Sequence, residues 1–193
     1  MRLADIYPLH AGRDCRSGSD KGDVHSFIEV YEELFAPYQT TARNVLEIGL
    51  MGGHSLLMWE KYFAQAAVHG IDLCDQPHGG LADLRPLIAE GTHRIALLDA
   101  TLPEQVETAF GSTLFDVIVE DASHALSHQL SIYANFKSHL AFDGIYAIED
   151  VADIDRDRAL FENIDKERRV QIIDRRQVKG RFDDVLVVIG GRP

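Results

Sequence analysis

Six acidic residues lie at or near the ends of short apolar runs in the sequence. They are Glu47, Asp72, Asp99, Asp121, Glu149 and Asp150. If the runs are parallel strands, their carboxyl ends share one edge of a sheet, and the acids gather in one crevice there. Any single acid at a strand end is as readily a helix cap. Six together favour a site that holds a cation or a hydroxyl-rich ligand, since clustered like charges otherwise cost stability.

A glycine-containing turn follows the first apolar run. Residues 47–55 read EIGLMGGHS, so Gly49 and Gly53 let the backbone turn tightly and approach a ligand. The dinucleotide fingerprint G-x-G-x-x-G is absent here, because Met51 and His54 replace its second and third glycines. An acidic crevice also repels a pyrophosphate. It suits S-adenosylmethionine, which carries a sulfonium, an ammonium and a ribose diol.

Two of the strand-end acids have natural partners on such a cofactor. Asp72, after the second run, is placed to accept hydrogen bonds from both ribose hydroxyls. Asp99 and Ala100, after the third run, are placed to contact the amino edge of the adenine. The glycine turn alone is weak evidence, but together with these positions it predicts a cofactor site.

The apolar runs and their spacing define the elements that position these residues. Near-continuous apolar runs over 45–48, 68–72, 95–99, 115–121 and 144–150 predict strands buried in a parallel sheet, with helices between them. The runs 170–173 and 185–189 are joined by too few residues for a helical crossover, so we expect an antiparallel pair. The pattern predicts an α/β three-layer sandwich around a seven-stranded, mostly parallel sheet with an antiparallel C-terminal hairpin.

Helical patterns occur before and between the strands. An amphipathic stretch over 25–38 predicts a helix whose apolar stripe is core, and another covers 126–140. Thr101 and Glu104 have the spacing of a capping box at the start of a helix. The charged stretch 153–169 predicts a solvated helix.

Composition excludes several classes of protein. The 193 residues carry a net charge of −12 with 46% apolar residues, which is typical of a globular domain and disfavours nucleic-acid or anionic-membrane binding. Cys15 and Cys74 are too few for a disulfide framework and fit no zinc pattern, so we expect inert thiols. No apolar run is long enough to span a membrane, and the first residues do not resemble a signal peptide. We expect a cytoplasmic protein.

Several motifs together resemble a known family. The turn over 47–56 with Trp59 looks like motif I of class I S-adenosylmethionine-dependent methyltransferases, whose fold is Rossmann-like. The segment 20–35, the run Glu120–His124 (EDASH) and Ile148–Val151 (IEDV) are similar to a metal-dependent group that methylates macrolide sugars and rhamnosides. Proteins similar to cephalosporin hydroxylase are relatives of that group. The length of the chain predicts one domain over 1–193, and the resemblance implies an N-terminal helix and lid segment over 1–40 before a Rossmann-like core over 41–193.

The resemblance also assigns roles to individual residues. It implies that Asp121, Glu149 and Asp150 bind one divalent cation and that His124 is the general base beside Asp121. Either the resemblance or a position at a strand end predicts the residues that bind the cofactor. They are Lys21, His25, Glu47, Gly49, Gly53, Ser55, Asp72, Leu73, Asp99, Ala100 and Asp121. Three carboxylates without a nearby cysteine form a hard oxygen site, which favours Mg²⁺ or Mn²⁺.

The residues and the resemblance together predict a metal-dependent O-methyltransferase that uses S-adenosylmethionine, and the resemblance implies that it acts on a sugar hydroxyl of a glycoside or glycan. The alternatives are a catechol-type or other vicinal-diol acceptor, a cephalosporin hydroxylase-like activity, and a protein that binds the cofactor without chemistry. His124 and the pair Glu149–Asp150 could instead cap helices. We expect a small-molecule or glycan partner, no nucleic acid and no membrane; a homo-oligomer is compatible with the sequence, and the loop 73–83 is available to cover the site.

Overall fold

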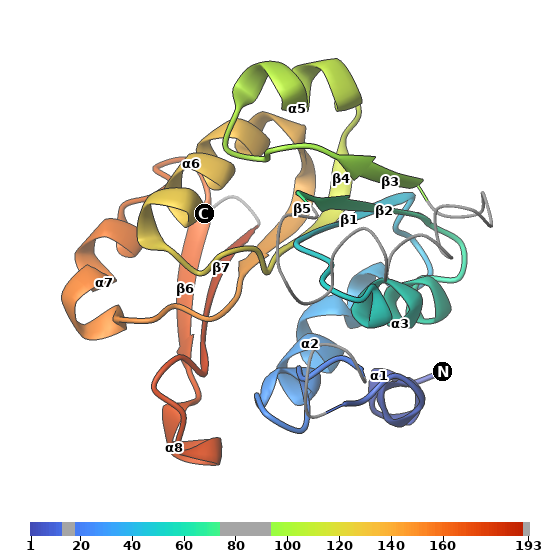
Figure 1. Cartoon of the computed structure of the whole chain (residues 1–193), viewed down its shortest axis with the longest axis vertical. Helices are drawn as coiled ribbons and strands as arrows, with labels where there is room; N and C mark the ends of the chain where they lie inside the picture. The colour runs from blue at the N-terminus through green and yellow to red at the C-terminus, as the bar shows by residue number, and fades with distance from the viewer. Residues whose placement is uncertain (13–17, 74–93, 191–193) are drawn as a thin grey trace.

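The computed structural model describes residues 1–12, 18–73 and 94–190, and it contains a seven-stranded sheet (Figure 1). The strands are β1 (Asn44–Ile48), β2 (Ala67–Asp72), β3 (Arg94–Leu97), β4 (Phe115–Glu120), β5 (Leu140–Ile148), β6 (Arg169–Asp174) and β7 (Val185–Gly190). Their order is β3-β2-β1-β4-β5-β7-β6. The pairs from β3 to β5 are parallel, whereas β7 runs antiparallel to both β5 and β6.

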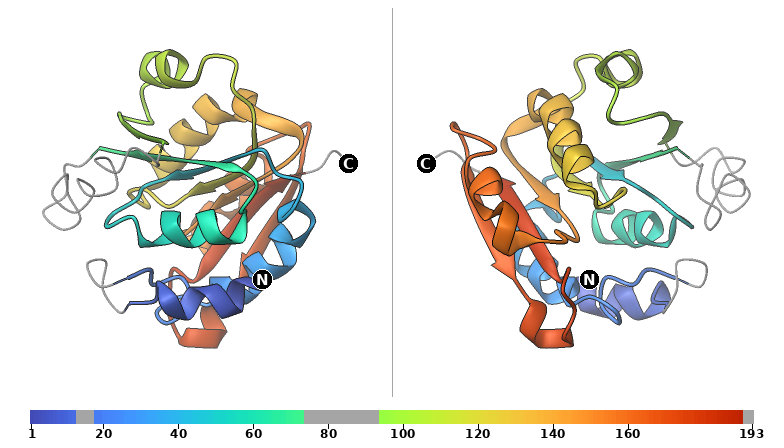
Figure 2. Two further views of the ribbon diagram at one scale, coloured as in Figure 1. Left: turned by 90° about the vertical axis from the view of Figure 1, so that its right-hand side faces the viewer. Right: turned by 60° about the vertical axis from the view of Figure 1, so that its left-hand side comes forward.

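Helices cover both faces of the sheet, as Figure 2 shows in two further views. The helices are α1 (Leu3–Ile6), α2 (Phe27–Phe35), α3 (His54–Tyr62), α5 (Pro103–Phe110), α6 (Leu126–Phe136), α7 (Ile154–Glu162) and α8 (Arg176–Lys179). One apolar core joins α1, α2 and α3 to one face, and it includes the fully buried Trp59. The other core joins α5, α6 and α7 to the opposite face. The three-layer sandwich predicted from the apolar runs is confirmed.

Strand positions follow the apolar runs closely, with differences at element ends. The closing strands β6 and β7 pair antiparallel as predicted, although the short α8 lies in their connection. Strand β5 begins at Leu140, several residues before the predicted run. The charged stretch after it forms only α7, whose Ile154 and Phe161 are buried rather than solvated.

The capping box predicted at Thr101 is wrong. Helix α5 begins at Pro103 with Leu102 at its N-cap position and no side-chain capping bond. The Thr101 Oγ1 atom donates instead to Asp99 Oδ1 at 2.6 Å, and the Thr101 amide donates to the same oxygen at 2.9 Å. The Asp99 carboxylate therefore competes successfully for the hydroxyl that would have capped the helix.

The N-terminal segment packs on the layer of α3 and reaches the sheet edge. Leu3 and Ile6 of α1 are fully buried in the core that α2 and α3 share. The connection between α1 and α2 brings Lys21 and His25 to the carboxyl ends of β1, β4 and β5. No helix of the described residues is long and apolar enough to cross a membrane. Both cysteines and nearly all of the loop 73–83 lie outside the described residues.

Candidate active site

The loop after β1 packs directly against the end of β4, and only glycine fits at its first position. Gly49 has φ +90°, and a Cβ atom there would lie 2.1 Å from the carbonyl oxygen of Asp121. The Asp121 amide donates to the Ile48 carbonyl oxygen at 2.8 Å, which holds the two strand ends together. A side chain at Gly49 would therefore displace Asp121.

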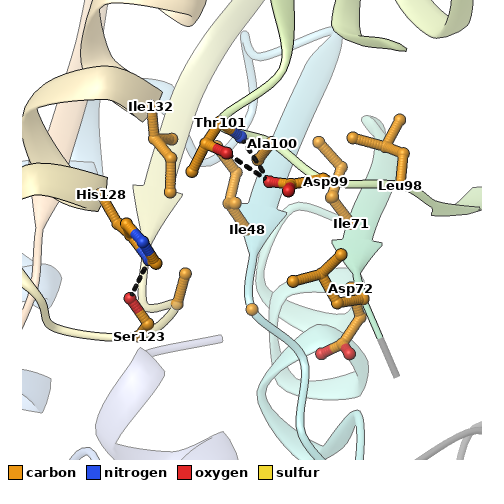
Figure 3. A pocket seen from close by; sticks show the side chains of 13 residues that line it. Ile48, Ile71, Asp72, Leu98, Asp99, Ala100, Thr101, Ser123, His128 and Ile132 are labelled. Atoms are coloured by element: carbon orange, nitrogen blue, oxygen red, sulfur yellow. Dashed lines mark hydrogen bonds between the residues drawn. The ribbon is translucent and has the colours of Figure 1, made fainter. Parts of the chain in front are cut away.

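Asp72 at the end of β2 holds the same loop from the other side. Its Oδ2 atom accepts from the amides of Leu50 at 2.8 Å and Met51 at 3.2 Å. These two hydrogen bonds fix the orientation of the Asp72 carboxylate. Figure 3 shows that side chain on the wall of a pocket.

This strand-end pocket is the hollow at the carboxyl ends of β1, β2 and β3 (Figure 3). It is lined by Ile48, Gly49, Ile71, Asp72, Leu73, Leu98, Asp99, Ala100, Thr101, Ala122, Ser123, His128 and Ile132. Asp72 and Asp99 lie on one side, and Ser123 and His128 on the other, with their Oγ and Nδ1 atoms 2.7 Å apart. A mostly apolar wall with two carboxylates suits an adenosine group, which has a flat apolar body and hydroxyl donors.

A second hollow, the acidic pocket, adjoins the first and shares Gly49 and Ala122 with it. It is lined by Gly18, Ser19, Asp20, Lys21, Gly49, Leu50, Met51, Gly52, His54, Ser55, Asp121, Ala122, His124 and Asp150. The two pockets thus meet at the glycine loop. A ligand with an adenosine end and a charged end can occupy both.

Lys21 is buried among three carboxylates beneath the acidic pocket. Its Nζ atom lies 2.5 Å from Asp121 Oδ2, 2.8 Å from Glu149 Oε1 and 3.6 Å from Glu47 Oε1. The Tyr31 hydroxyl donates to the same Glu149 oxygen at 2.7 Å. Burial would lower the pKa of Lys21, but these carboxylates outweigh it and raise that pKa well above its usual value. Lys21 is therefore the cation that holds the three strand ends together.

The carboxylates respond to burial to different extents. Burial raises the pKa of Glu47 to about 7 despite the opposing charge of Lys21, and it raises the pKa of Glu149 well above its usual range. Burial also disfavours ionised Asp121, but Lys21 and His124 outweigh it, so the pKa of Asp121 is lowered. Asp121 is thus the acid of this group that stays ionised.

His124 stands between two carboxylates at the rim of the acidic pocket. Its Nε2 atom lies 3.0 Å from Asp121 Oδ1, and its Nδ1 atom lies 3.7 Å from Asp150 Oδ2. Burial would lower the pKa of His124, but the hydrogen bond with Asp121 and the charges of Asp121 and Asp150 raise it to about 9. Burial, followed by the charge of Asp121, raises the pKa of Asp150 to about 8.

The predicted metal ligands occupy two different environments. Ligand atoms of Asp121, His124 and Asp150 all lie within 4.8 Å of one another, which is close enough to surround one ion. The Glu149 side chain instead contacts Lys21 and Tyr31 in the interior. The structure therefore brings Asp121 and Asp150 together beside His124. Binding of one cation by all three predicted carboxylates, those of Asp121, Glu149 and Asp150, stays a prediction.

Most of the predicted cofactor residues line the two pockets. Those in the strand-end pocket are Gly49, Asp72, Leu73, Asp99 and Ala100, and those in the acidic pocket are Lys21, Gly49, Ser55 and Asp121. Glu47, Gly53 and His25 line neither pocket. Glu47 is fully buried near Lys21, and Gly53, at φ +78°, is the N-cap residue of α3.

Sequence reasoning missed three residues at the site. His128 lines the strand-end pocket and contacts Ser123. Tyr31, expected to be apolar core, is buried but donates to Glu149. Glu120 is fully buried, and burial raises its pKa to about 8. The i,i+4 spacing of His124 and His128 is not a helical signal here, because α6 begins at Leu126 and His124 has φ +57°.

Curated relatives share the sequence of most of this chain. The chain is 30% identical over 151 residues to the 8-demethyl-8-alpha-L-rhamnosyl tetracenomycin-C 2'-O-methyltransferase of Streptomyces olivaceus, a match that covers 75% of this chain and 38% of the relative. It is 30% identical over 137 residues to the mycinamicin VI 2''-O-methyltransferase of Micromonospora griseorubida, covering 67% of this chain and 32% of that protein. The chain thus spans well under half the length of these relatives. No family model matches it.

Solved structures share the fold. The MycE methyltransferase from the mycinamycin biosynthetic pathway, solved with Mg, SAH and mycinamycin VI, has a TM-score of 0.75 at 19% identity, covering 100% of this chain and 54% of that chain. An SAH-bound methyltransferase of Podospora anserina has a TM-score of 0.62 at 14% identity, covering 99% and 88%. The resemblance found in the sequence is confirmed: curated homologues are sugar O-methyltransferases of macrolide and tetracenomycin pathways, and the fold is that of class I methyltransferases.

Proposed function

We propose that this chain, a homologue of sugar O-methyltransferases with the class I methyltransferase fold, transfers a methyl group from S-adenosylmethionine to a sugar hydroxyl. The acceptor is a glycoside of a natural product or a glycan, and a divalent cation, Mg²⁺ or Mn²⁺, is required. The observation that carries the proposal is the position of Asp121, His124 and Asp150. They gather at the rim of the acidic pocket, next to a second pocket suited to adenosine.

The residues at this rim fit a hard dication. Asp121 and Asp150 repel one another, since burial and the charge of Asp121 together raise the pKa of Asp150. A cation between them would offset that repulsion, and carboxylate oxygens are the ligands that Mg²⁺ and Mn²⁺ prefer. Asp121 and Asp150 would hold the ion. Glu149 would join them only by leaving its contacts with Lys21 and Tyr31.

The cofactor would lie across both pockets. Asp72 and Asp99 would accept hydrogen bonds from the ribose and the adenine, and the apolar walls of Ile48 and Ile132 would enclose the base. The charged methionine end would lie in the acidic pocket near Asp121. His124 lines the same acidic pocket, so it would lie at the charged end of the cofactor site.

The chemistry that this chain's residues perform is proton transfer at one imidazole. When bound, S-adenosylmethionine supplies the methyl group, and a divalent ion lowers the pKa of a hydroxyl that ligates it. With a pKa of about 9, His124 is protonated at neutral pH and cannot act as a base. It would become one if a cation engaged Asp121 and Asp150, because the hydrogen bond with Asp121 and the charges of both aspartates are what raise its pKa. His124 would then accept the hydroxyl proton, and the oxygen would bond to the methyl carbon as the carbon–sulfur bond breaks and S-adenosylhomocysteine leaves.

A direct assay tests the proposal. The purified chain is incubated with S-adenosylmethionine, Mg²⁺ and a panel of rhamnosyl and macrolide glycosides and catechols, and products are examined by mass spectrometry. The expected result is a mass gain of one CH₂ on a glycoside, lost with EDTA and restored by added Mg²⁺. Methylation that persists at full rate after thorough metal removal would refute metal dependence, and methylation of catechols alone would refute the sugar acceptor.

A pair of histidine variants tests the general base. His124→Ala should lower kcat by about 10²- to 10⁴-fold while leaving the affinity for S-adenosylhomocysteine unchanged. His139→Gln is the matched control, since His139 donates from Nδ1 to the Thr113 carbonyl oxygen at 3.0 Å instead of facing the carboxylates. Near-normal turnover in His124→Ala would remove this residue from the mechanism.

A further inference from the structure

A second group of metal-binding side chains lies behind Asp150, on the side away from His124. Ligand atoms of His25, Asp150 and Asp183 all lie within 4.8 Å of one another. His25 precedes α2, Asp150 follows β5, and Asp183 precedes β7, so three segments far apart in the sequence converge here. All three residues are buried, at 2%, 6% and 8% exposure, which distinguishes them from an ordinary acidic surface patch.

Two atoms of this group lack the partners that burial demands. Among the described residues, His25 Nδ1 and Asp150 Oδ1 have no hydrogen-bond partner. These two atoms lie 3.1 Å apart, yet they are not aligned for a hydrogen bond with each other. Buried polar atoms in native proteins are almost always satisfied, so a pair that faces one another without a bond indicates a missing ligand.

The charges around the group are unequal. Asp183 accepts from Arg181 at both oxygens, at 2.9 and 2.6 Å, but each oxygen keeps a further lone pair. Asp184 Oδ1 lies 3.7 Å from His25 Nδ1, and its carboxylate accepts from the amide and hydroxyl of Ser26. Four carboxylates, those of Asp20, Asp150, Asp183 and Asp184, thus act on His25, with Arg181 as the nearby cation. A dication would offset the excess negative charge and use the unpaired imidazole nitrogen.

The Asp150 carboxylate divides its two oxygens between the two groups. Oδ1 faces His25, whereas Oδ2 lies 3.7 Å from His124 in the group proposed above for the first ion. A carboxylate that presents one oxygen to each of two ligand sets is the bridging arrangement of two-metal centres. The two groups therefore share Asp150 and have separate remaining ligands.

We propose that His25, Asp150 and Asp183 bind a second divalent cation, bridged through Asp150 to the ion held with Asp121. One imidazole nitrogen with carboxylate oxygens suits a first-row transition metal such as Mn²⁺ better than Mg²⁺. The second ion fixes the orientation of Asp150 and hence of the acidic pocket rim. The inference concerns metal binding alone and holds whether or not the acceptor is a sugar.

Metal counting tests this proposal without any turnover. The metal-free full chain is equilibrated with Mn²⁺, and bound ions are counted by dialysis with elemental analysis and by electron paramagnetic resonance. The wild type should bind two Mn²⁺ per chain, with the halved hyperfine spacing of a carboxylate-bridged pair. Asp183→Asn should keep one ion and lose the coupled signal, with the affinity of the second ion falling at least about tenfold. Asp155→Asn, at an exposed aspartate, is the control and should bind two.

The variants separate this proposal from the proposed function. Asp121→Asn should lose the first ion and keep the second, the reverse of Asp183→Asn. His25→Gln repeats the test at the imidazole, and it replaces Asp183→Asn if circular dichroism shows that variant unfolded. One ion per wild-type chain, unaffected by Asp183→Asn and His25→Gln but lost in Asp121→Asn, would overturn the second site and leave the proposed function standing. No Mn²⁺ bound at all would overturn both.

Discussion

Replacing Lys21 with methionine tests the electrostatic organisation of the whole site. Methionine has nearly the volume and flexibility of the lysine stem, so the change removes the ammonium and leaves the packing largely intact. The Nζ atom lies within 4.0 Å of oxygens of Glu47, Asp121 and Glu149. The Lys21 side chain is 1% exposed, so water does not replace the lost partner.

The expected loss of stability is large. Removing one partner of a buried ion pair typically costs about 3–5 kcal/mol, because the other charge stays buried and uncompensated. In Lys21→Met the carboxylates of Glu149 and Glu47 respond by taking up protons, which limits the loss. We therefore expect Lys21→Met to lower the free energy of unfolding by about 3–5 kcal/mol at about pH 8, and by less in mild acid.

The pH dependence has a definite sign. Without Lys21 the pKa values of Glu47 and Glu149 in the folded state rise further above their values in the unfolded state. At any pH between the unfolded and the folded pKa, the folded state binds more protons than the unfolded one. Stability of the variant then falls as pH rises, by up to about 1.4 kcal/mol per pH unit for each such group. Added Mg²⁺ should recover part of the loss, by about 2.7 kcal/mol at 100 times its Kd, if it takes over the role of the ammonium.

Urea denaturation followed by circular dichroism measures these effects. Wild type, Lys21→Met and the exposed-lysine control Lys137→Met are compared at about pH 6 and about pH 8, with and without Mg²⁺. The control should match wild type throughout. A Lys21→Met variant as stable as wild type at the higher pH, with no response to Mg²⁺, would show that Lys21 does not compensate these carboxylates in the folded protein.

Three other changes test the glycine loop, a buried acid and the strand-end pocket. Gly49→Ala should lower thermal stability by about 3 kcal/mol or more, since its Cβ would meet the Asp121 carbonyl; a normal Tm would contradict this. Burial raises the pKa of Glu120 from 4.5 to about 8, so this residue makes wild-type stability fall as pH rises between those values, and Glu120→Gln should make that slope shallower in urea unfolding; an unchanged slope would contradict this. Asp72→Ala should weaken S-adenosylhomocysteine binding about 10- to 100-fold by calorimetry; an unchanged Kd would show that Asp72 holds the glycine loop without binding the cofactor.

The sheet could be predicted because its signals are local. Buried parallel strands require unbroken apolar runs, and each run here ends near an acid. The sequence therefore predicts which residues lie at the strand ends of the crevice, although it does not predict the order of the strands. The glycine turn was equally readable, since positive φ at Gly49 and Gly53 requires glycine-like residues. Predictions failed where two local options compete, as at Thr101, whose hydroxyl bonds Asp99 instead of capping α5.

The interior partners of the acids could not be predicted. Glu149 and Asp150 are neighbours in sequence, yet the first contacts Lys21 in the interior and the second lies beside His124 at the pocket rim. Asp150 has φ +54°, and no sequence rule predicts that an aspartate at that position adopts the left-handed backbone conformation. Lys21 lies 100 residues from Asp121, so only the assembled fold shows that its ammonium occupies the centre of the carboxylates.

Backbone strain and charge repulsion coincide at the acidic pocket. Three non-glycine residues of the described chain have positive φ, namely Met51, His124 and Asp150, and all three line this pocket. Each such conformation costs about 1–3 kcal/mol and persists only where the surrounding structure determines it. Here the determinants are β4 and β5 in the middle of the sheet, with apolar cores on both faces. Strained backbone and mutually repelling carboxylates at one place lower the stability of the unliganded fold, and a bound ligand would offset that loss. The pocket rim as a whole, rather than any single acid, therefore supports a ligand site.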